Sequence, residues 1–414
     1  MGFLVSPGVD INEIDLTNVI PAVSTSIGAY AGQFTKGPVG VATLISSEKE
    51  LVDTFGSPSK RGDASAASFL TAASFLKYGN ALWVSRCRPA GLYNASSGGG
   101  VTAFYASEDS DGTDFDQDSD MDDDVYAADA GLLGNSLRVE VVHRDNTSFS
   151  DDAFNVFNND PGTSTWAEDR NLRYDEVNIV VIDEDGDITG TQNKILESYE
   201  GVSIVKDAKK ADGTSNFVCD VINRNSNYIR IPENAFGGVF EIEGDSDGLG
   251  DSSVAVAFGL TLAEILAEAD SDSEANGIVD IRTTAAVDAD LRFPLTGGVD
   301  GTSTTATDTE IINALDLFAD PEKIDINLLF SQTAENEDSQ DQIADKIKTI
   351  CEARKDCIGF VSPNTGVSAG ASNVKSYFDD IGSSSYLVFD SSPLLVYNRY
   401  ADENVYIPAC GHMA

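Results

Sequence analysis

The sequence predicts an α/β inner domain, with a mixed or parallel sheet and crossover helices, that carries an inserted, mainly β outer domain. Helix-like and strand-like segments alternate over 21–90 and again over 297–414, whereas 91–296 is polar and mostly strand-like. A flexible stretch of small residues, Ala95 to Gly100, accompanies the first change in character. The strand–helix–strand spacing over 324–361 predicts a right-handed parallel crossover. We therefore expect one discontinuous domain, formed by the two outer segments, and one insertion.

Residues 1–20 are expected to form an extended N-terminal arm. Val9 and Ile11 alternate with polar residues, and the apolar phase then shifts by one residue to Ile14 and Leu16, which indicates a bulge or bend between the pairs. An isolated strand cannot bury itself, so the arm must pair with a sheet. On this pattern alone, that sheet belongs either to the same domain or to a neighbouring molecule.

The segment 21–90 has the element order of an α/β unit. Ser47 and Glu50 have the spacing of a helix-capping box, and Gly56 ends the helix that follows. Asp63 is interpreted as the cap of a second helix, which ends at Gly79. The expected strands cover 24–34, 39–45 and 81–86.

The segment 297–414 returns to the same alternation. One predicted helix, 342–355, faces inward through residues at helical spacing: Ile343, Ile347, Ile350 and Cys351. The other expected elements are helices over 310–319 and near Val374, and strands over 324–330, 358–361 and 386–389. The last ten residues look like a strand or loop inside a domain, so we expect the inner domain to be incomplete at its C-terminus.

The charge balance excludes several classes of partner. The chain has 69 acidic and 26 basic residues, a net charge of −43. Such a surface repels nucleic acid and anionic membranes. An aspartate-rich segment, 107–124, is interpreted as a solvated acidic loop that condenses cations weakly, with a shaped calcium site as the alternative. No apolar run approaches the roughly 18 residues that insertion into a membrane requires.

The candidate catalytic residues give little support to an enzymatic function. Gly366 to Gly370 spell G-x-S-x-G around Ser368, and Asp390, Asp402 and His412 follow in the order of an α/β-hydrolase triad. Pro363, Asn364 and Thr365 separate the preceding strand from this motif, whereas a nucleophile elbow lies directly between strand and helix. We therefore favour a small-residue loop and keep a hydrolase as the alternative.

The remaining residue counts predict neither a metal site nor a cofactor. Only two histidines occur, so a His-based metal site is nearly excluded, and no phosphate-binding loop is present. The five cysteines are scattered without a C-x-x-C pair, which suggests reduced, buried thiols in a cytosol-like compartment. They are Cys87, Cys219, Cys351, Cys357 and Cys410.

The stretch from Glu197 to Ile229 carries a packing pattern without catalytic residue types. Ala211 to Gly213 form a turn signal, and Ser215 can cap a short helix. The apolar face of that helix would consist of Phe217, Val218, Val221 and Ile222. This order of elements closely resembles the contractile tail sheath proteins of phages, in which it belongs to an outward-facing module. Further segments resemble that family in the same order: 6–9, 131–141, 295–301, 314–320, 354–363 and 397–414.

The resemblance implies a structural subunit and not an enzyme. Sheath subunits form stacked helical rings around an inner tail tube, and their terminal arms add strands to sheets of neighbouring subunits. By this reading Val9, Ile11, Ile14 and Leu16 are inter-subunit contacts. A baseplate signal triggers contraction, which drives the tube through the host envelope for genome ejection; the energy lies in the difference between two subunit packings.

The same resemblance implies the partners and the location. The partners are other sheath subunits, the tail tube protein, and baseplate and tail terminator proteins. The location is the virion tail, after assembly in the host cytoplasm. The sheath of a related contractile injection device, of the pyocin or secretion-system type, shares these mechanics and stays open as an alternative.

The chain departs from the family at its end. Family members continue beyond the Pro-Ala-x-Gly-His-x-Ala segment at 408–414. That further portion completes the inner domain, contacts the tube and provides sheet for a neighbour's arm. We therefore expect residues 1–414 alone to be soluble without forming a normal sheath.

Overall fold

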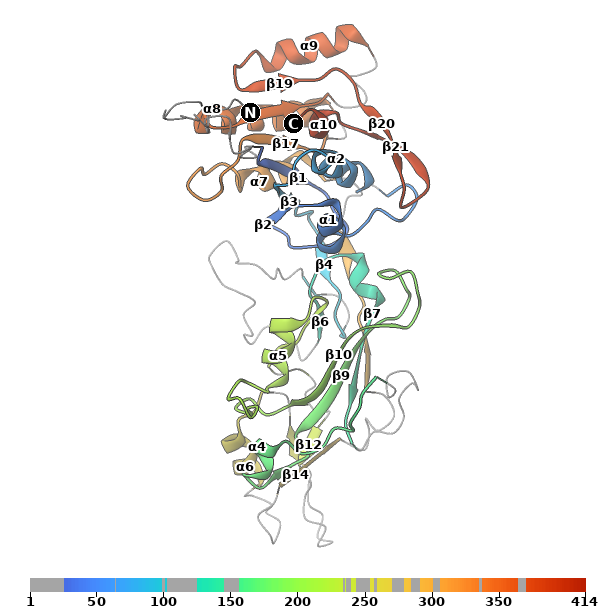
Figure 1. The fold of residues 1–414 in the computed structure, drawn as a ribbon, viewed down its shortest axis with the longest axis vertical. Helices are drawn as coiled ribbons and strands as arrows, with labels where there is room; N and C mark the ends of the chain where they lie inside the picture. The colour runs from blue at the N-terminus through green and yellow to red at the C-terminus, as the bar shows by residue number, and fades with distance from the viewer. Residues whose placement is uncertain are drawn as a thin grey trace, which may run out of the picture.

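The molecule is elongated, with helices and a large sheet at one end and smaller sheets along the rest of its length (Figure 1). The computed structural model describes residues 26–63, 65–98, 101–102, 125–144, 156–233, 235, 240–242, 254–256, 259–269, 279–283, 291–300, 306–334, 337–363 and 370–414.

The large sheet has six strands in the order β19-β18-β17-β1-β3-β2. All neighbours are parallel except β2, which runs antiparallel to β3. The sheet joins distant parts of the chain, because Tyr30 lies opposite both Val84 and Phe330. The strands are β1 (Gly28–Gly32), β2 (Ala42–Ile45), β3 (Leu82–Arg86), β17 (Leu328–Ser331), β18 (Ile358–Val361) and β19 (Leu387–Phe389). The structure thus confirms a mixed α/β fold with a mainly parallel sheet.

Alternate residues of β1 enter two different cores, one on each face of this sheet. Ala29 and Ala31 pack with α7, α8 and α9, whereas Tyr30 packs with α1, α2 and α10. The helices are α1 (Glu48–Phe55), α2 (Ala66–Leu76), α7 (Asp308–Asp316), α8 (Glu337–Arg354), α9 (Ala371–Ile381) and α10 (Cys410–Met413). All four residues predicted for the inward face of α8 are buried, as expected.

Ser47 caps the first helix as predicted, but its capping box and the start of the second helix need correction. Ser47 Oγ accepts a hydrogen bond from Glu50 N at 3.3 Å, but the Glu50 carboxylate accepts from Ser46 N at 2.8 Å and not from Ser47 N. The second helix begins at Ala66, later than expected, because Asp63 Oδ1 accepts from Ser65 N at 2.8 Å and forms a turn before the helix.

The segment between the two halves of the large sheet builds several small sheets. One antiparallel sheet has the order β10-β9-β7-β15, and one mixed sheet has the order β13-β12-β14-β8. Their strands are β7 (Leu137–Val142), β8 (Leu172–Arg173), β9 (Glu176–Asp183), β10 (Lys194–Ser203), β12 (Phe240–Ile242), β13 (Val254–Val256), β14 (Val279–Thr283) and β15 (Arg292–Pro294). The shorter pairings involve β4 (Leu92–Asn94), β5 (Val101–Thr102), β6 (Tyr126–Ala127), β11 (Ile229–Arg230) and β16 (Val299–Asp300).

In the described ranges, short helices accompany these sheets, and one of them belongs to the Glu197–Ile229 stretch. They are η2 (Leu132–Ser136), α4 (Thr165–Glu168), α5 (Val218–Asn225) and α6 (Leu262–Ala269). The predicted cap of α5 lies two residues too early: Phe217 holds the N-cap position, and Ser215 Oγ accepts from Phe217 N at 3.2 Å. At the other end of α5, Ser226 Oγ donates to Glu197 at 2.6 Å and so fastens the helix to β10.

Candidate assembly site

The last two strands form a hairpin with an inner and an outer face. In β20 (Leu394–Asn398) and β21 (Glu403–Ile407), Leu395 lies opposite Tyr406 in an antiparallel pairing. On the inner face Ile407 is 1% exposed and joins the core that contains α2. On the outer face Leu395, Tyr397 and Tyr406 are 56%, 57% and 61% exposed. A group of large exposed apolar and aromatic side chains on one face is typical of a contact surface.

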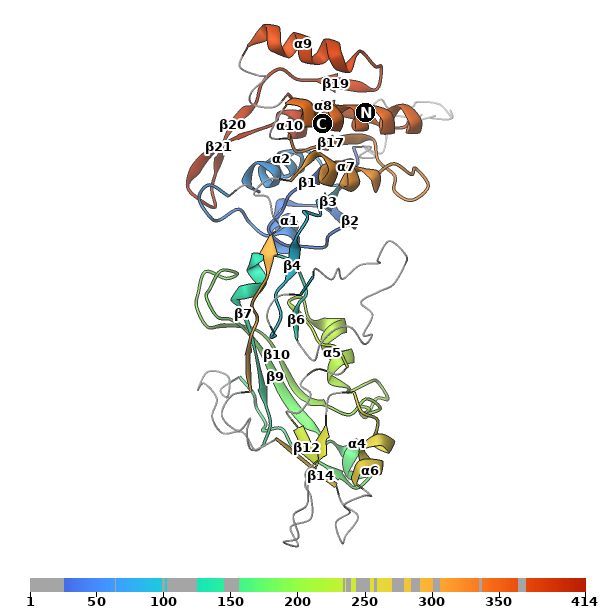
Figure 2. The same cartoon turned by 180° about the vertical axis from the view of Figure 1, so that it is seen from behind.

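The hairpin also has free strand edges. β20 and β21 form a two-stranded sheet, so within the described ranges each strand has one edge that no other strand covers. Figures 1 and 2 show the hairpin, in red, along the outer side of the end that contains α2. An uncovered edge presents backbone N–H and C=O groups, which can pair with a strand from another molecule.

The tip of the hairpin is held by the segment that joins α1 to α2. Asn398 Nδ2 donates to the Pro58 carbonyl at 3.0 Å, and Arg61 Nη2 donates to the Asp402 carbonyl at 2.9 Å. Asp402 has a φ of +53°, a left-handed conformation that aspartate tolerates in turns. These contacts fix the hairpin before any partner binds, which lowers the entropy cost of binding.

The predicted arm contacts are Val9, Ile11, Ile14 and Leu16. They lie outside the described residues, and so does the acidic segment 107–124. Both assignments stay predictions.

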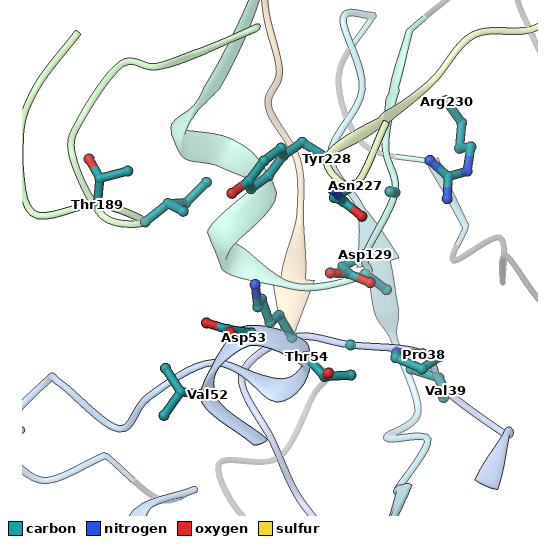
Figure 3. A pocket seen from close by; sticks show the side chains of 15 residues that line it. Pro38, Val39, Val52, Asp53, Thr54, Asp129, Thr189, Asn227, Tyr228 and Arg230 are labelled. Carbon is teal, nitrogen blue, oxygen red and sulfur yellow. The ribbon is translucent and has the colours of Figure 1, made fainter. Parts of the chain in front are cut away.

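A second feature is a cleft of about 690 Å³ between α1 and the segment that contains β6 and β11. Figure 3 shows Val52, Asp53 and Thr54 on one wall, with Asn227 and Tyr228 on the other. Its polar side chains come from several elements: Lys36, Asp53, Asp129, Thr189 and Arg230.

Asp129, a charged residue of this cleft, lies near the buried side chain of Arg86. Burial raises the pKa of Asp129, while the nearby Arg86 and Lys36 act in the opposite direction. Arg86 itself is 2% exposed and donates to the carbonyls of Gly37 and Ala130, both at 2.9 Å. The cleft therefore offers side chains of both charges next to a buried arginine that is engaged by backbone carbonyls.

Among the described residues, the acidic and histidine members of the triad order contact different partners. Ser368 lies outside the described residues. Among those described, Asp390 accepts a hydrogen bond from Ser362 Oγ, Asp402 accepts one from Tyr397 Oη at 2.8 Å, and the His412 ring lies edge-on to Tyr78 at 5.5 Å. The two carboxylates and the imidazole thus have separate partners.

The described part of the chain contains no group of three His, Cys, Asp or Glu side chains placed to hold a metal ion. Nor does it contain a helix that is both long and apolar enough to cross a bilayer.

The hairpin was missed by sequence reasoning, although a signal for it exists. Leu394 and Val396 alternate with Leu395 and Tyr397, and the same spacing returns at 403–407 after a turn that contains Asp402. Because both faces carry apolar side chains, the alternation between apolar and polar residues is hidden.

No family model matches the chain, but three curated relatives do. It is 39% identical over 102 residues to the tail sheath protein of Vibrio phage KVP40, a match that covers 25% of this chain and 14% of the relative. It is 37% identical over 83 residues to the tail sheath protein of Enterobacteria phage T4, a match that covers 20% of this chain and 12% of the relative. It is 26% identical over 473 aligned positions to the tail sheath protein of Salmonella phage ViI, a match that covers 100% of this chain and 69% of the relative.

Among solved structures, the sheath tail protein from Listeria innocua gives a TM-score of 0.43 at 10% identity, covering 94% of this chain and 54% of that one. One of the three curated relatives aligns with the whole of this chain. Tail sheath proteins are structural proteins, in agreement with the expectation that the chain is not an enzyme. Over its whole length the chain is similar to a phage tail sheath protein, and shorter segments match two further tail sheath proteins at higher identity.

Proposed function

We propose that the chain is the repeating subunit of a contractile tail sheath that polymerises in stacked helical rings around an inner tail tube. Contraction of this lattice drives the tube through the host envelope for genome ejection. The chain's partners are then other copies of itself, the tail tube protein, and baseplate and tail terminator proteins in the virion tail. The matches to three tail sheath proteins support this proposal.

The β20–β21 hairpin is the observation that carries the proposal at the level of residues. The arm of a neighbouring copy would add a strand to an edge of the hairpin, so that backbone hydrogen bonds supply the affinity. Every second side chain of the added strand would then lie on the same face as Leu395, Tyr397 and Tyr406. The alternating pairs Val9/Ile11 and Ile14/Leu16 supply apolar side chains at that spacing.

The charge of the chain makes such local contacts necessary. At a net charge of −43, copies repel one another at long range, and salt reduces this repulsion. Backbone hydrogen bonds and apolar contacts depend much less on ionic strength. Assembly through the hairpin should therefore improve as the salt concentration rises.

The division into domains follows from the same proposal. We infer that 21–90 and 297–414 form the inner domain and that 91–296 is inserted into it. Ser96 and Thr296 exchange backbone hydrogen bonds of 3.0 and 2.9 Å, so the entering and leaving segments run side by side. Chain ends that lie close together are typical of inserted domains.

Photo-crosslinking between copies tests the proposed contact. A photoreactive amino acid replaces Ile11 in a ¹⁵N-labelled chain, which is mixed with an unlabelled chain at high salt and irradiated. We expect labelled arm peptides to be joined to unlabelled peptides from 394–407. In a matched pair of unlabelled partners, Tyr406→Lys should lose the crosslink, whereas Tyr78→Lys, at an 80% exposed tyrosine elsewhere, should keep it. Crosslinks confined to one copy, or spread over other surfaces, would contradict strand addition.

A further inference from the structure

Two cysteines face each other beneath the surface turn that joins α8 to β18. Cys351 lies in the last turn of α8, and Cys357 immediately precedes β18. Their Sγ atoms are 3.5 Å apart, and both side chains are buried. A disulfide has an S–S distance of about 2 Å, so a shift of roughly 1.5 Å would close the bond. In the described residues, the other three cysteines have no thiol partner of this kind.

The turn between these cysteines is held in place by Arg354. Its guanidinium donates to the carbonyls of Phe318 at 2.8 Å and Ile324 at 3.0 Å. It also binds both carboxylate oxygens of Asp356, each at 3.0 Å. Lys355 completes the reversal of the chain with a φ of +64°. The position of the second sulfur is therefore set by contacts that exist before any oxidation.

The first sulfur is positioned by a glycine in β18. A Cβ atom at Gly359 would lie 3.2 Å from Cys351 Sγ and would overlap the Ile347 side chain. The absence of a side chain at this position lets α8 approach the sheet closely and directs Cys351 towards the turn. Both sulfurs are thus fixed at short range, which favours an intramolecular reaction over any reaction between molecules.

The two thiols also differ chemically from the other three. The hydrogen bond within the pair lowers the pKa of Cys357 and raises that of Cys351, because the remaining S–H stabilises one thiolate. The Arg354 guanidinium also lowers the pKa of Cys357, whereas burial and the Asp356 carboxylate act in the opposite direction. By contrast, burial raises the pKa of Cys87, Cys219 and Cys410. The thiolate is the reactive form, so oxidation should begin at Cys357.

We propose that Cys351 and Cys357 form a reversible intramolecular disulfide when a small peroxide reaches this turn. The Cys357 thiolate attacks one oxygen of hydrogen peroxide, the O–O bond breaks, and the hydroxide that leaves becomes water by taking up the proton that the thiol released when it ionised. Cys351 Sγ then attacks the sulfenic sulfur; the S–S bond forms as the S–O bond breaks, and a second water leaves with the Cys351 proton. Two thiols are oxidised to one disulfide, and one peroxide is reduced to two waters.

The bond would tie the last turn of α8 to the start of β18. A reducing cytosol keeps such a pair as thiols, so the bond belongs to chains that have entered an oxidising environment. A dithiol reductant reverses it by thiol–disulfide exchange.

The test is peroxide treatment of the folded full chain, followed by unfolding in the presence of an alkylating reagent. Trypsin then cleaves after Lys348, Arg354 and Lys355 and places the two cysteines on separate peptides. We expect mass spectrometry to find these peptides joined, with the mass of two hydrogen atoms lost, and dithiothreitol to separate them. The other three cysteines should be recovered alkylated.

Two variants serve as controls. Cys357→Ser should remove the joined peptides, and Cys410→Ser should leave them unchanged, because Cys410 Sγ contacts the Ser331 carbonyl and no thiol. The wild-type result stands whether or not either variant folds. Recovery of both peptides as separate alkylated species after peroxide, or joining of either cysteine to Cys87, Cys219 or Cys410, would overturn the proposal.

Discussion

The guanidinium of Arg86 donates to the backbone carbonyl of Ala130 at 2.9 Å. Arg86 ends β3 of the six-stranded sheet, and Ala130 follows β6 in the segment 91–296. The same side chain also donates to the carbonyls of Phe34 and Gly37. One buried cation therefore satisfies backbone acceptors from both parts of the molecule.

Arg86→Lys should destabilise the fold strongly. Lysine keeps the charge but cannot reach three carbonyls in the planar arrangement of a guanidinium, so buried acceptors lose their partners. We expect the free energy of unfolding in urea to fall by about 2–4 kcal/mol. The matched change Arg224→Lys, at an exposed position, should alter it by less than about 0.5 kcal/mol. Equal effects of the two changes would show that the buried contacts contribute little.

Asp390 should make stability depend on pH. Burial raises the pKa of its carboxyl to about 6, above the value of about 4 expected in the unfolded chain. When the pKa of a carboxyl is higher in the folded chain, its contribution to stability is fully present at a pH below the pKa in the unfolded chain. This contribution is lost as the pH rises through the folded pKa of about 6. Asp390→Asn should therefore stabilise the chain by roughly 1–2 kcal/mol at pH 8 and by little at pH 4.5, allowing for solvent screening.

Urea unfolding of Asp390→Asn at both pH values measures this difference. Asp380→Asn is the control, because Asp380 is an exposed residue of α9, the helix that precedes β19. This substitution should have only a small effect on stability. A stabilisation by Asp390→Asn that is equal at pH 4.5 and pH 8 would contradict the raised pKa.

The two faces of the β20–β21 hairpin should respond differently to substitution. Ile407→Ala removes a buried side chain and should lower the free energy of unfolding by about 2–4 kcal/mol. Tyr406→Lys changes the exposed face and should alter it by less than about 0.5 kcal/mol. Only Tyr406→Lys should abolish the crosslink between copies while the fold persists. If Tyr406→Lys also unfolds the chain, the outer face has a structural role instead.

Gly411 should tolerate no side chain. A Cβ atom there would overlap the carbonyl oxygen of Thr71 and approach Ser74 Oγ at 3.0 Å. Gly411→Ala should therefore push α10 away from α2 and lower the free energy of unfolding by about 1–3 kcal/mol. His412→Ala, at the exposed neighbouring position, should have little effect. Thermal unfolding of the two variants checks this contrast.

Helices with a clear apolar period could be predicted from the sequence, but their ends could not. The inward face of α8 was predicted correctly, whereas its start at Glu337 was missed because the first turns carry mainly polar residues. For α7 a usable signal was overlooked. Thr307 and Glu310 form a capping box, which starts the helix at Asp308 and before the predicted residue 310.

Strand pairing could not be predicted in the same way. The alternation of side chains tells which residues of a strand share a face, but it does not identify the neighbouring strand. β1 pairs with β17 from a distant part of the chain, and the same uncertainty concealed the antiparallel edge strand β2.

The position of the β20–β21 hairpin depends on contacts between residues that are far apart in the sequence. Asn398 reaches Pro58, and Tyr400 Oη donates to Glu48 at 3.0 Å, across more than 300 positions of sequence. No local pattern encodes such contacts. The sequence therefore supplied the family resemblance and the arm hypothesis, whereas the hairpin had to come from the structure.

Electron microscopy of native particles labelled with antibodies against this chain tests the central claim most directly. We expect gold label along the whole shaft of the tail between head and baseplate, and along a shorter, wider shaft in contracted particles. Label confined to the head or the baseplate, or absent from the shaft in both states, would contradict a sheath subunit.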